Sequence, residues 1–459
     1  MMKLFNAFRQ VIGIVGHPSH PSVSWSDKRL KSLKDIGLNT LQLSIAWSSK
    51  PENEVLNMED LDNAETAAIY KSRVERAHNF GLHALAHFGI PKVQSYDMDA
   101  TDRCIMDPQV VDNYRKRLEV FFREYDADDV MIYTYDQLAW LCSEFGNCPR
   151  CKGIPLHERL VPFLESLVEA IQQGKPGARL WWEPWELSEG QIIEMVERIK
   201  PEYFGIMMHN SIAEVYFVNT TDLAFRNIAR LAGSRGIPFV GEGHFGGAGD
   251  DIITINHMPC PRLVFQELDA MRNTKGLTGV KEYYGFEPDH FAVNIEMFKS
   301  YLISPDKKLE ELLEPMAASY GGASEILLEA WEAAAQGMEL FPFNASWWLR
   351  QLVDEPKMQE YKKLPTADWM TPSWKANRRG YYIVTDESRQ HPWLLEDVGL
   401  RACAAARRYS KAVDLLKQAE GMSNKSEDIK LQRFDLTRLM QASLRFGESM
   451  LAHRADELS

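Results

Sequence analysis

Short apolar or aromatic runs recur along the first two thirds of this sequence, and a helical pattern follows each of them. Strands that alternate with helices predict a parallel sheet. Eight such units occupy about 280 residues, close to the ~250 typical of a closed eight-fold βα barrel. The expected strands span Gln10–Gly16, Thr40–Trp47, Leu82–Phe88, Val130–Tyr135, Ala178–Trp182, Tyr203–Met208, Ile237–Val240 and Gly279–Tyr284.

A doubly wound sheet shows the same alternation of strands and helices. The number of units favours the barrel, and so do the polar or acidic residues that close nearly every strand. The segment GIVGHPSHP after the first strand also lacks the third glycine and the helix start of a dinucleotide-binding fingerprint. We therefore expect an α/β fold, a (β/α)8 TIM barrel over residues 1–295.

After about residue 290 the strand pattern fades and helical periods take over. Residues 308–340, interrupted at 320–322, and residues 395–420 and 426–455 all read as amphipathic helices. An aromatic, proline-rich segment lies between the first of them and the other two. The expected second domain, residues 296–459, is mainly α-helical, with this segment connecting it to the barrel.

The formal net charge of −13 argues against nucleic acid or an anionic membrane as the main partner. No apolar run approaches the ~18 residues of a membrane-spanning helix. The N-terminus shows no signal peptide, and six cysteines in 459 residues do not make a disulfide scaffold. We expect a cytoplasmic protein, although a secreted form whose leader has been removed would give the same sequence.

Barrel enzymes carry their reactive groups at the carboxyl ends of the strands, where the loops converge. Here acids dominate those ends, beside histidines and aromatic residues. This mixture suits glycoside hydrolysis, which needs a proton donor, a carboxylate as base or nucleophile, and aromatic faces for sugar rings. The candidate catalytic residues are His17, Asp136, Glu183, Glu242 and Glu282, and the candidate substrate-binding residues are Trp47, His87, Tyr135, Trp182, His209, Asn210, His244 and Asn344.

A strand-end acid also serves to cap a helix or to pair with arginine, so no single candidate is decisive. Asp136 and Glu242 follow the fourth and seventh strands and are expected to face each other across the mouth. Glu183 and Glu282 are the alternatives. No HExxH motif occurs, and no HxH pair closes the first or the fourth strand. Direct acid–base chemistry without a required cofactor is therefore favoured over a catalytic metal.

The loop after the fourth strand carries the sharpest spacing in the chain, Cys142-x5-Cys148-x2-Cys151, with His157 six residues later. Thiolates with an imidazole form tetrahedral zinc sites, which predicts a structural zinc. Loop-stabilising thiols or a disulfide remain alternatives, because C-x5-C is not a standard zinc spacing. His257 is a remote alternative to His157, and Cys104 and Cys403 are expected to be free thiols.

Three segments resemble the glycoside hydrolase barrels: GLNTLQLSIAW followed by KPENEVLNMEDL, EPWE after the fifth strand, and GVKEYYGF at the eighth. The resemblance covers about residues 10–290 and is architectural, since the Asn-Glu-Pro tripeptide of the large retaining clan is absent. The layout is similar to the inverting exo-sialidases of glycoside hydrolase family 156. That resemblance implies a His/Asp acid–base pair on His17 and Asp136, with Asn344 as an additional group. Strand-end arginines suited to a sialic carboxylate are scarce here.

The leading hypothesis is thus an exo-acting glycosidase, an inverting sialidase, with a carbohydrate as its partner. One alternative is a two-carboxylate glycosidase of the glucuronidase or hexosaminidase kind. A barrel lyase or isomerase is another, with Lys281 as the candidate Schiff-base lysine, and a non-catalytic carbohydrate-binding barrel is the third. Asn344 could reach the mouth from its own chain or from a second subunit, so a homodimer remains an alternative to a monomer.

Overall fold

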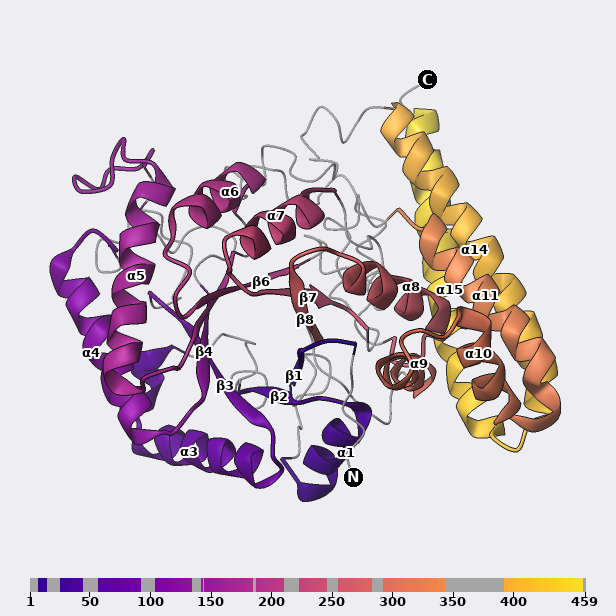
Figure 1. Ribbon diagram of the computed structural model, residues 1–459. Coiled ribbons are helices and arrows are strands. Elements are labelled where there is room, and N and C mark those ends of the chain that lie inside the picture. The colour runs from indigo at the N-terminus through magenta and orange to yellow at the C-terminus, as the bar shows by residue number, and fades with distance from the viewer. Residues whose placement is uncertain are drawn as a thin grey trace.

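The structure, a computed structural model, contains the expected closed barrel of parallel strands (Figure 1). It describes residues 7–14, 25–43, 57–91, 104–133, 142, 144–184, 187–209, 223–245, 255–282, 292–342 and 392–456. Each strand pairs with the next along the chain, and β8 pairs with β1 to close the ring. The strands are β1 (Gln10–Ile14), β2 (Thr40–Leu43), β3 (His83–Gly89), β4 (Asp129–Tyr133), β5 (Leu180–Glu183), β6 (Phe204–His209), β7 (Phe239–Gly243) and β8 (Leu277–Glu282).

Helices surround the barrel and follow the strands in order (Figure 1). Their ends follow local sequence signals: the Ser26 side chain caps the first helix, and Gly37 ends it in the left-handed region at φ 119°. Asp107 caps a later helix that opens with Pro108. The helices are α1 (Asp27–Ile36), α3 (Ala64–Asn79), α4 (Pro108–Glu124), α5 (Leu156–Gly174), α6 (Glu189–Arg198), α7 (Leu223–Ser234), α8 (Pro261–Arg272) and α9 (Ala292–Ile303).

The strands bury both of their faces, because one lines the barrel interior and the other packs against the helices. A small inner cluster fills the interior and is separate from the main core between strands and helices. Trp181 is its largest member. Gly205 lies on the neighbouring strand, where a Cβ atom would fall 2.5 Å from the Trp181 ring. The inner cluster consists of Ile12, Leu85, Met131, Trp181, Met207 and Val240.

Polar residues close the amino-terminal end of the barrel. Asp129 at the start of β4 accepts hydrogen bonds from the Trp181 indole at 3.0 Å and from the Arg179 amide at 2.7 Å. His83 on β3 lies 3.1 Å from the same carboxylate. In barrels of this kind the amino-terminal end serves stability rather than chemistry. We therefore assign this network to the fold.

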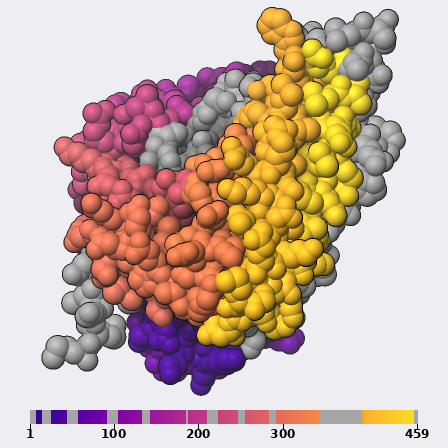
Figure 2. Space-filling view, turned by 90° about the vertical axis from the view of Figure 1, so that its right-hand side faces the viewer, coloured from indigo at the N-terminus to yellow at the C-terminus, as the bar shows by residue number. Residues whose placement is uncertain are grey.

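The C-terminal helices stand as a wall beside the barrel, as the space-filling view shows (Figure 2). They are α10 (Leu309–Ala318), α11 (Ser324–Leu340), α14 (Pro392–Glu420) and α15 (Ser426–Asp456). Arg262 of α8 joins the wall to the barrel through Glu332 and Glu339 of α11, each at 2.8 Å. Among the described helices, none is long and apolar enough to cross a membrane.

Candidate active site

Four ionisable side chains meet on the inner face of the barrel near the carboxyl ends of consecutive strands. Glu183 ends β5, His209 ends β6, Glu242 lies on β7 and Lys281 on β8. The strand register places His209 opposite Glu242 and Glu242 opposite Lys281. All four are buried, with exposed fractions of 6% or less. Burying charged side chains costs free energy unless they are paired. A cluster of four buried ionisable side chains therefore marks a candidate functional site.

The two carboxylates share one imidazole. His209 Nε2 lies 3.0 Å from Glu183 Oε1 and 2.9 Å from Glu242 Oε2. A nitrogen between two carboxylate oxygens acts as a donor, so the Nε2 atom carries a proton. Lys281 Nζ lies 2.6 Å from the other Glu242 oxygen, Oε1. The hydrogen bond of His209 goes to Glu183, so Glu242 is paired chiefly with Lys281 and has the imidazole close to its other oxygen.

The surroundings move the pKa values of the two carboxyl groups in opposite directions. Burial alone would raise the pKa of Glu242, but Lys281 and His209 outweigh it and hold that pKa below its usual range. Burial and the negative charge of Glu242 raise the pKa of Glu183, and Lys281 and His209 only partly oppose this. Two neighbouring carboxyl groups whose pKa values are pushed apart in this way are the arrangement that acid–base catalysis uses.

His87 was a predicted substrate-binding residue, and the structure places it close to this group. Burial, followed by the charge of Lys281, lowers the pKa of His87 to about 3. Its ring is thus neutral near pH 7. The His87 Nδ1 atom lies 2.9 Å from the Gln42 amide nitrogen. Gln42 was not among the predicted residues, although it is the one polar residue between Leu41 and Leu43 in β2.

Two predicted site residues face the wrong side of their strands. Trp182 belongs to the core between strands and helices, where it packs near Phe204, while Trp181 faces the interior. Glu282 follows Lys281 in β8, and successive side chains alternate, so it projects from the opposite face. Trp182 therefore cannot stack on a sugar in the barrel mouth. Glu282 is not a partner for Glu242.

The remaining predicted residues divide into one that is described and six that are not. His244 follows β7 directly and is buried, two residues beyond Glu242 and hence on the same side of the chain. Outside the described residues lie His17, Trp47, Tyr135, Asp136, Asn210 and Asn344. Their proposed roles stay predictions.

The same three strand ends also offer metal ligands. One ligand atom each from Glu183, His209 and Glu242 lie within 4.8 Å of one another. Two carboxylates and an imidazole suit Mn²⁺ or Zn²⁺. Lys281 already places a cationic group against Glu242, however, and this competes with a metal for the Glu242 carboxylate.

The predicted cysteine cluster forms, but with a different fourth member. The sulfur atoms of Cys142, Cys148 and Cys151 are joined by that of Cys104, all within 4.8 Å of one another. Cys104 was predicted to be a free thiol, and it precedes α4, far from the others in sequence. His157 lies instead near Glu194, at 3.9 Å, because it is on α5 and points toward α6.

His257, the alternative fourth ligand, also interacts with another part of the chain. His257 Nδ1 lies 2.9 Å from the Asp435 carboxylate of α15, a helix that Figure 1 shows across the barrel from α4 and α5. Cys403 on α14 is partly buried and is not a member of the cluster.

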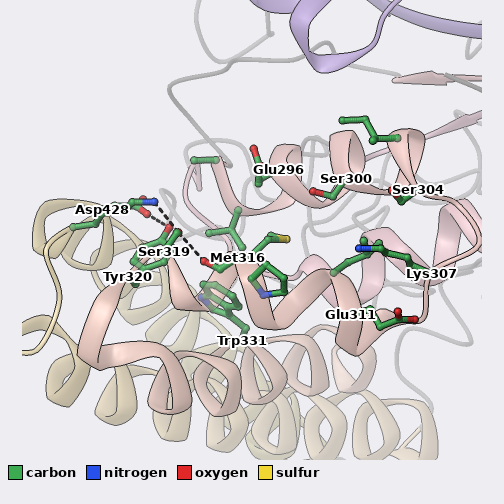
Figure 3. A pocket seen from close by; sticks show the side chains of 16 residues that line it. Glu296, Ser300, Ser304, Lys307, Glu311, Met316, Ser319, Tyr320, Trp331 and Asp428 are labelled. Atoms are coloured by element: carbon green, nitrogen blue, oxygen red, sulfur yellow. Dashed lines mark hydrogen bonds between the residues drawn. The ribbon is translucent and has the colours of Figure 1, made fainter. Parts of the chain in front are cut away.

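A cavity of about 720 Å³ lies between α9, α10 and α15, away from the strand ends (Figure 3). Two pairs of its polar side chains are hydrogen-bonded to each other: Lys425 donates to the Ser319 hydroxyl at 2.8 Å, and the Tyr320 hydroxyl donates to Asp428. No residue of β1–β8 lines it. We therefore place the candidate active site in the barrel.

No protein-family model matches the sequence, and no curated protein matches it. Among solved structures, this chain is similar to a GH138 enzyme targeting pectin rhamnogalacturonan II. The TM-score is 0.63 at 11% identity, over 98% of this chain and 59% of that one. This chain spans about three fifths of the length of the GH138 enzyme, and at this identity the likeness shows the shared fold.

Two further neighbours, also glycoside hydrolases, are more distant. PbGH5A, a glycoside hydrolase family 5 enzyme from Prevotella bryantii B14, has a TM-score of 0.41 at 12% identity, over 65% of this chain and 97% of that one. CpGH84D has a TM-score of 0.42 at 12% identity, over 98% of this chain and 76% of that one.

Proposed function

We propose that this chain is a glycoside hydrolase in which Glu183 is the general acid and Glu242 the ionised carboxylate. One observation carries the proposal: the two groups meet at strand carboxyl ends, and their pKa values are moved in opposite directions. Pairs of carboxyl groups tuned in this way supply the acid and the base, or the acid and the nucleophile, of sugar hydrolysis. The structural likeness to a GH138 enzyme supports the same reaction class.

In this mechanism Glu183 donates its proton to the glycosidic oxygen as the bond to the anomeric carbon breaks. The Glu242 carboxylate forms an ester bond to that carbon and displaces the leaving group. The Glu183 carboxylate then takes a proton from a water molecule, whose oxygen attacks the anomeric carbon and releases Glu242. His209 orients both carboxylates, and Lys281 keeps Glu242 ionised before attack.

The spacing favours retention of the anomeric configuration. Oxygens of Glu183 and Glu242 lie within 4.8 Å of one another. Retaining enzymes hold their carboxyl groups about 5–5.5 Å apart, whereas inverting enzymes leave ~6.5–9.5 Å for a water molecule. The inverting scheme with His17 and Asp136 is the competing hypothesis, and it predicts the opposite anomer.

For the substrate we propose a terminal sugar, with sialosides tested first because of the similarity in layout to the family 156 exo-sialidases. Fragments of pectin rhamnogalacturonan II are the second choice, since the GH138 enzyme is described as targeting that polymer. Glucuronides and N-acetylhexosaminides complete the panel. Release of single sugars would support exo action, whereas release of oligosaccharides would contradict it.

The test combines this panel with four variants. Glu183→Gln and Glu242→Gln should each lower kcat by ~10²–10⁴-fold, the usual contribution of a positioned acid or nucleophile. If Glu242 is then truncated to alanine, azide should enter the vacated space, attack the anomeric carbon, restore turnover and yield a glycosyl azide. Glu282→Gln is the matched control, because this buried glutamate projects from the other face of β8, and it should keep wild-type turnover. Near-wild-type turnover by Glu183→Gln would reject the assignment.

A second function is favoured by the metal-capable group of Glu183, His209 and Glu242. These ligands would suit a metal-dependent sugar isomerase, in which the metal polarises a substrate carbonyl. Addition of Mn²⁺ to protein that has been freed of metal with a chelator distinguishes the isomerase from the hydrolase. Isomerisation of free sugars that depends on the metal would support the isomerase, and metal-independent glycoside cleavage would support the hydrolase.

A further inference from the structure

The cysteine cluster, Cys104, Cys142, Cys148 and Cys151, lies on the side of the barrel where the loops leave the strand carboxyl ends. Cys104 precedes α4 in the connection from β3, and the other three lie between β4 and α5. All four side chains are buried and form a group of their own, separate from the hydrophobic core. Two connections that are far apart in sequence thus bring four thiols to one point.

The sulfur positions match a tetrahedral metal site. Cys104 Sγ lies 3.4 Å from Cys151 Sγ and 3.7 Å from Cys148 Sγ. With Zn–S bonds of about 2.3 Å, the edges of an S4 tetrahedron measure about 3.8 Å. A disulfide would instead require sulfur atoms about 2.05 Å apart. The observed distances are those of four ligands around a shared centre rather than of bonded pairs.

The local backbone is shaped around one of these sulfurs. The amide groups of Arg150 and Cys151 donate to Cys148 Sγ. The turn is closed by the Lys152 amide, which donates to the Cys148 carbonyl at 3.0 Å, and by Gly153 at φ 76°. Thiolates held by backbone N–H groups are suited to metal ligation.

Positive charge is placed next to the cluster. A zinc ion with four thiolates carries a net charge of −2, which needs compensation in a buried site. The Arg159 side chain is 1% exposed, pairs with Glu144 at 3.1 Å and donates to the Cys142 carbonyl at 2.7 Å. Arg150 pairs with Asp107 at 2.9 Å and so ties the two connections together from outside. The contacts of these two arginines therefore hold in place the β3–α4 and β4–α5 connections that carry the cysteines.

We propose that these four cysteines bind one structural Zn²⁺ ion, which joins the β3–α4 connection to the β4–α5 connection beside the barrel mouth. Four thiolates in tetrahedral geometry select zinc or iron among the common metals. The role is structural because all four positions are filled by protein ligands, which leaves none for a substrate or water. This proposal is independent of the glycosidase assignment, since no residue of the acid–base pair takes part.

The first measurement is the metal content of the full-length wild-type chain, purified without chelator and analysed by mass spectrometry for elements. About one zinc per chain is expected. Growth with Co²⁺ should give the strong visible absorption of a tetrahedral cobalt–thiolate site. Removal of the metal with a strong chelator should lower the Tm. A metal-free wild-type chain, iron in place of zinc, or an intact mass showing disulfides would each overturn the proposal.

Variants then assign the ligands. Cys104→Ser and Cys151→Ser should each lose most of the bound zinc, and Cys104→His, which keeps a zinc-binding atom, should retain more of it than Cys104→Ser. Cys403→Ser is the matched control and should keep the full amount. If Cys104→Ser retains wild-type zinc while folded, the four-cysteine site is wrong. Since the wild-type analysis needs no variant, a chain that fails to fold does not remove the test.

Discussion

Replacement of Lys281 by methionine tests the electrostatic argument on which the candidate site depends. The Lys281 Nζ atom lies 2.6 Å from Glu242 Oε1, and both side chains are essentially fully buried. At an effective dielectric constant of about 20, two unit charges at this distance attract by roughly 6 kcal/mol. Methionine has a similar volume but no charge, so Lys281→Met leaves a buried carboxylate with His209 as its remaining partner.

We expect the free energy of unfolding at pH 7 to fall by about 3–5 kcal/mol, the usual cost of removing one member of a buried pair. This is less than the full attraction because the wild-type pair already bears a desolvation cost. Urea unfolding followed by tryptophan fluorescence measures it. Lys200→Met, which removes a lysine from an exposed pair with Glu165 at 3.0 Å, is the control and should change little.

The pH dependence gives the sharper test. In the wild type the pKa of Glu242 lies below its usual 4.5, so its contribution to stability is present above pH 4.5 and is lost as the pH falls through the lowered value. In Lys281→Met burial raises that pKa, so the variant regains stability as Glu242 becomes protonated. The difference between the two proteins should therefore begin to shrink above pH 4.5, as the pH falls through the raised pKa of the variant, and shrink further below pH 4.5 as the wild type loses its own contribution.

A double variant completes the cycle. Replacing Glu242 by glutamine in the Lys281→Met background removes the unpaired charge, so part of the lost stability should return. A loss of less than about 1 kcal/mol for Lys281→Met, or a loss that stays constant between pH 7 and pH 4, would refute the reasoning. In that case Lys281 would act by packing and not by charge.

Two further predictions follow from the same geometry. The value of kcat/KM should fall at alkaline pH as Glu183, whose pKa is raised, loses its proton, and at acid pH as Glu242 gains one. An acid limb above the usual carboxyl pKa would contradict these roles. Gly205→Ala should cost about 1–3 kcal/mol, measured by urea unfolding, because its Cβ would fall 2.5 Å from Trp181, whereas Gly190→Ala has open space and should be neutral or slightly stabilising.

The fold was predictable because its signals are local. All eight strands lie where the apolar runs predicted them, and α1 is bounded by Ser26 and Gly37, which are residue types that signal a helix start and stop. The helices of the C-terminal region also match, including the break at 320–322, where Tyr320 follows α10 and a short 3₁₀ turn leads into α11. Periodicity, caps and glycine stops need only neighbouring residues for their effect.

The cysteine cluster is a feature that local sequence signals predict only in part. The Cys148-x2-Cys151 spacing located the loop correctly, and His157 was chosen as the fourth member because it is near in sequence. The structure brings in Cys104 instead, from the connection before α4. Only the adjacency of β3 and β4 brings that connection beside the next one, and no spacing rule within a single loop carries this information.

The orientation of side chains at the strand ends was the hardest part to predict, and the barrel itself is the reason. In a sheet with one wet face, alternating polar and apolar residues reveal which side chains point inward. Here both faces are buried, so Trp181 and Trp182 look alike in sequence, although the first fills the interior and the second packs against the helices.

Which of Lys281 and Glu282 points into the barrel depends on one irregularity in the pairing of β7 with β8. Phe239 pairs with Leu277, but Val240 pairs with Gly279, so one residue of β8 is skipped. Without that shift Val280 would stand opposite Glu242; with it, Lys281 does. An extra residue of this kind re-aims every side chain that follows it in the strand. Thr278 is the residue without a partner in the β7 register, so its removal should make the register regular and leave Lys281 opposite Glu242. Turnover should therefore survive this deletion, and a loss of turnover from a chain that still folds would contradict the register argument.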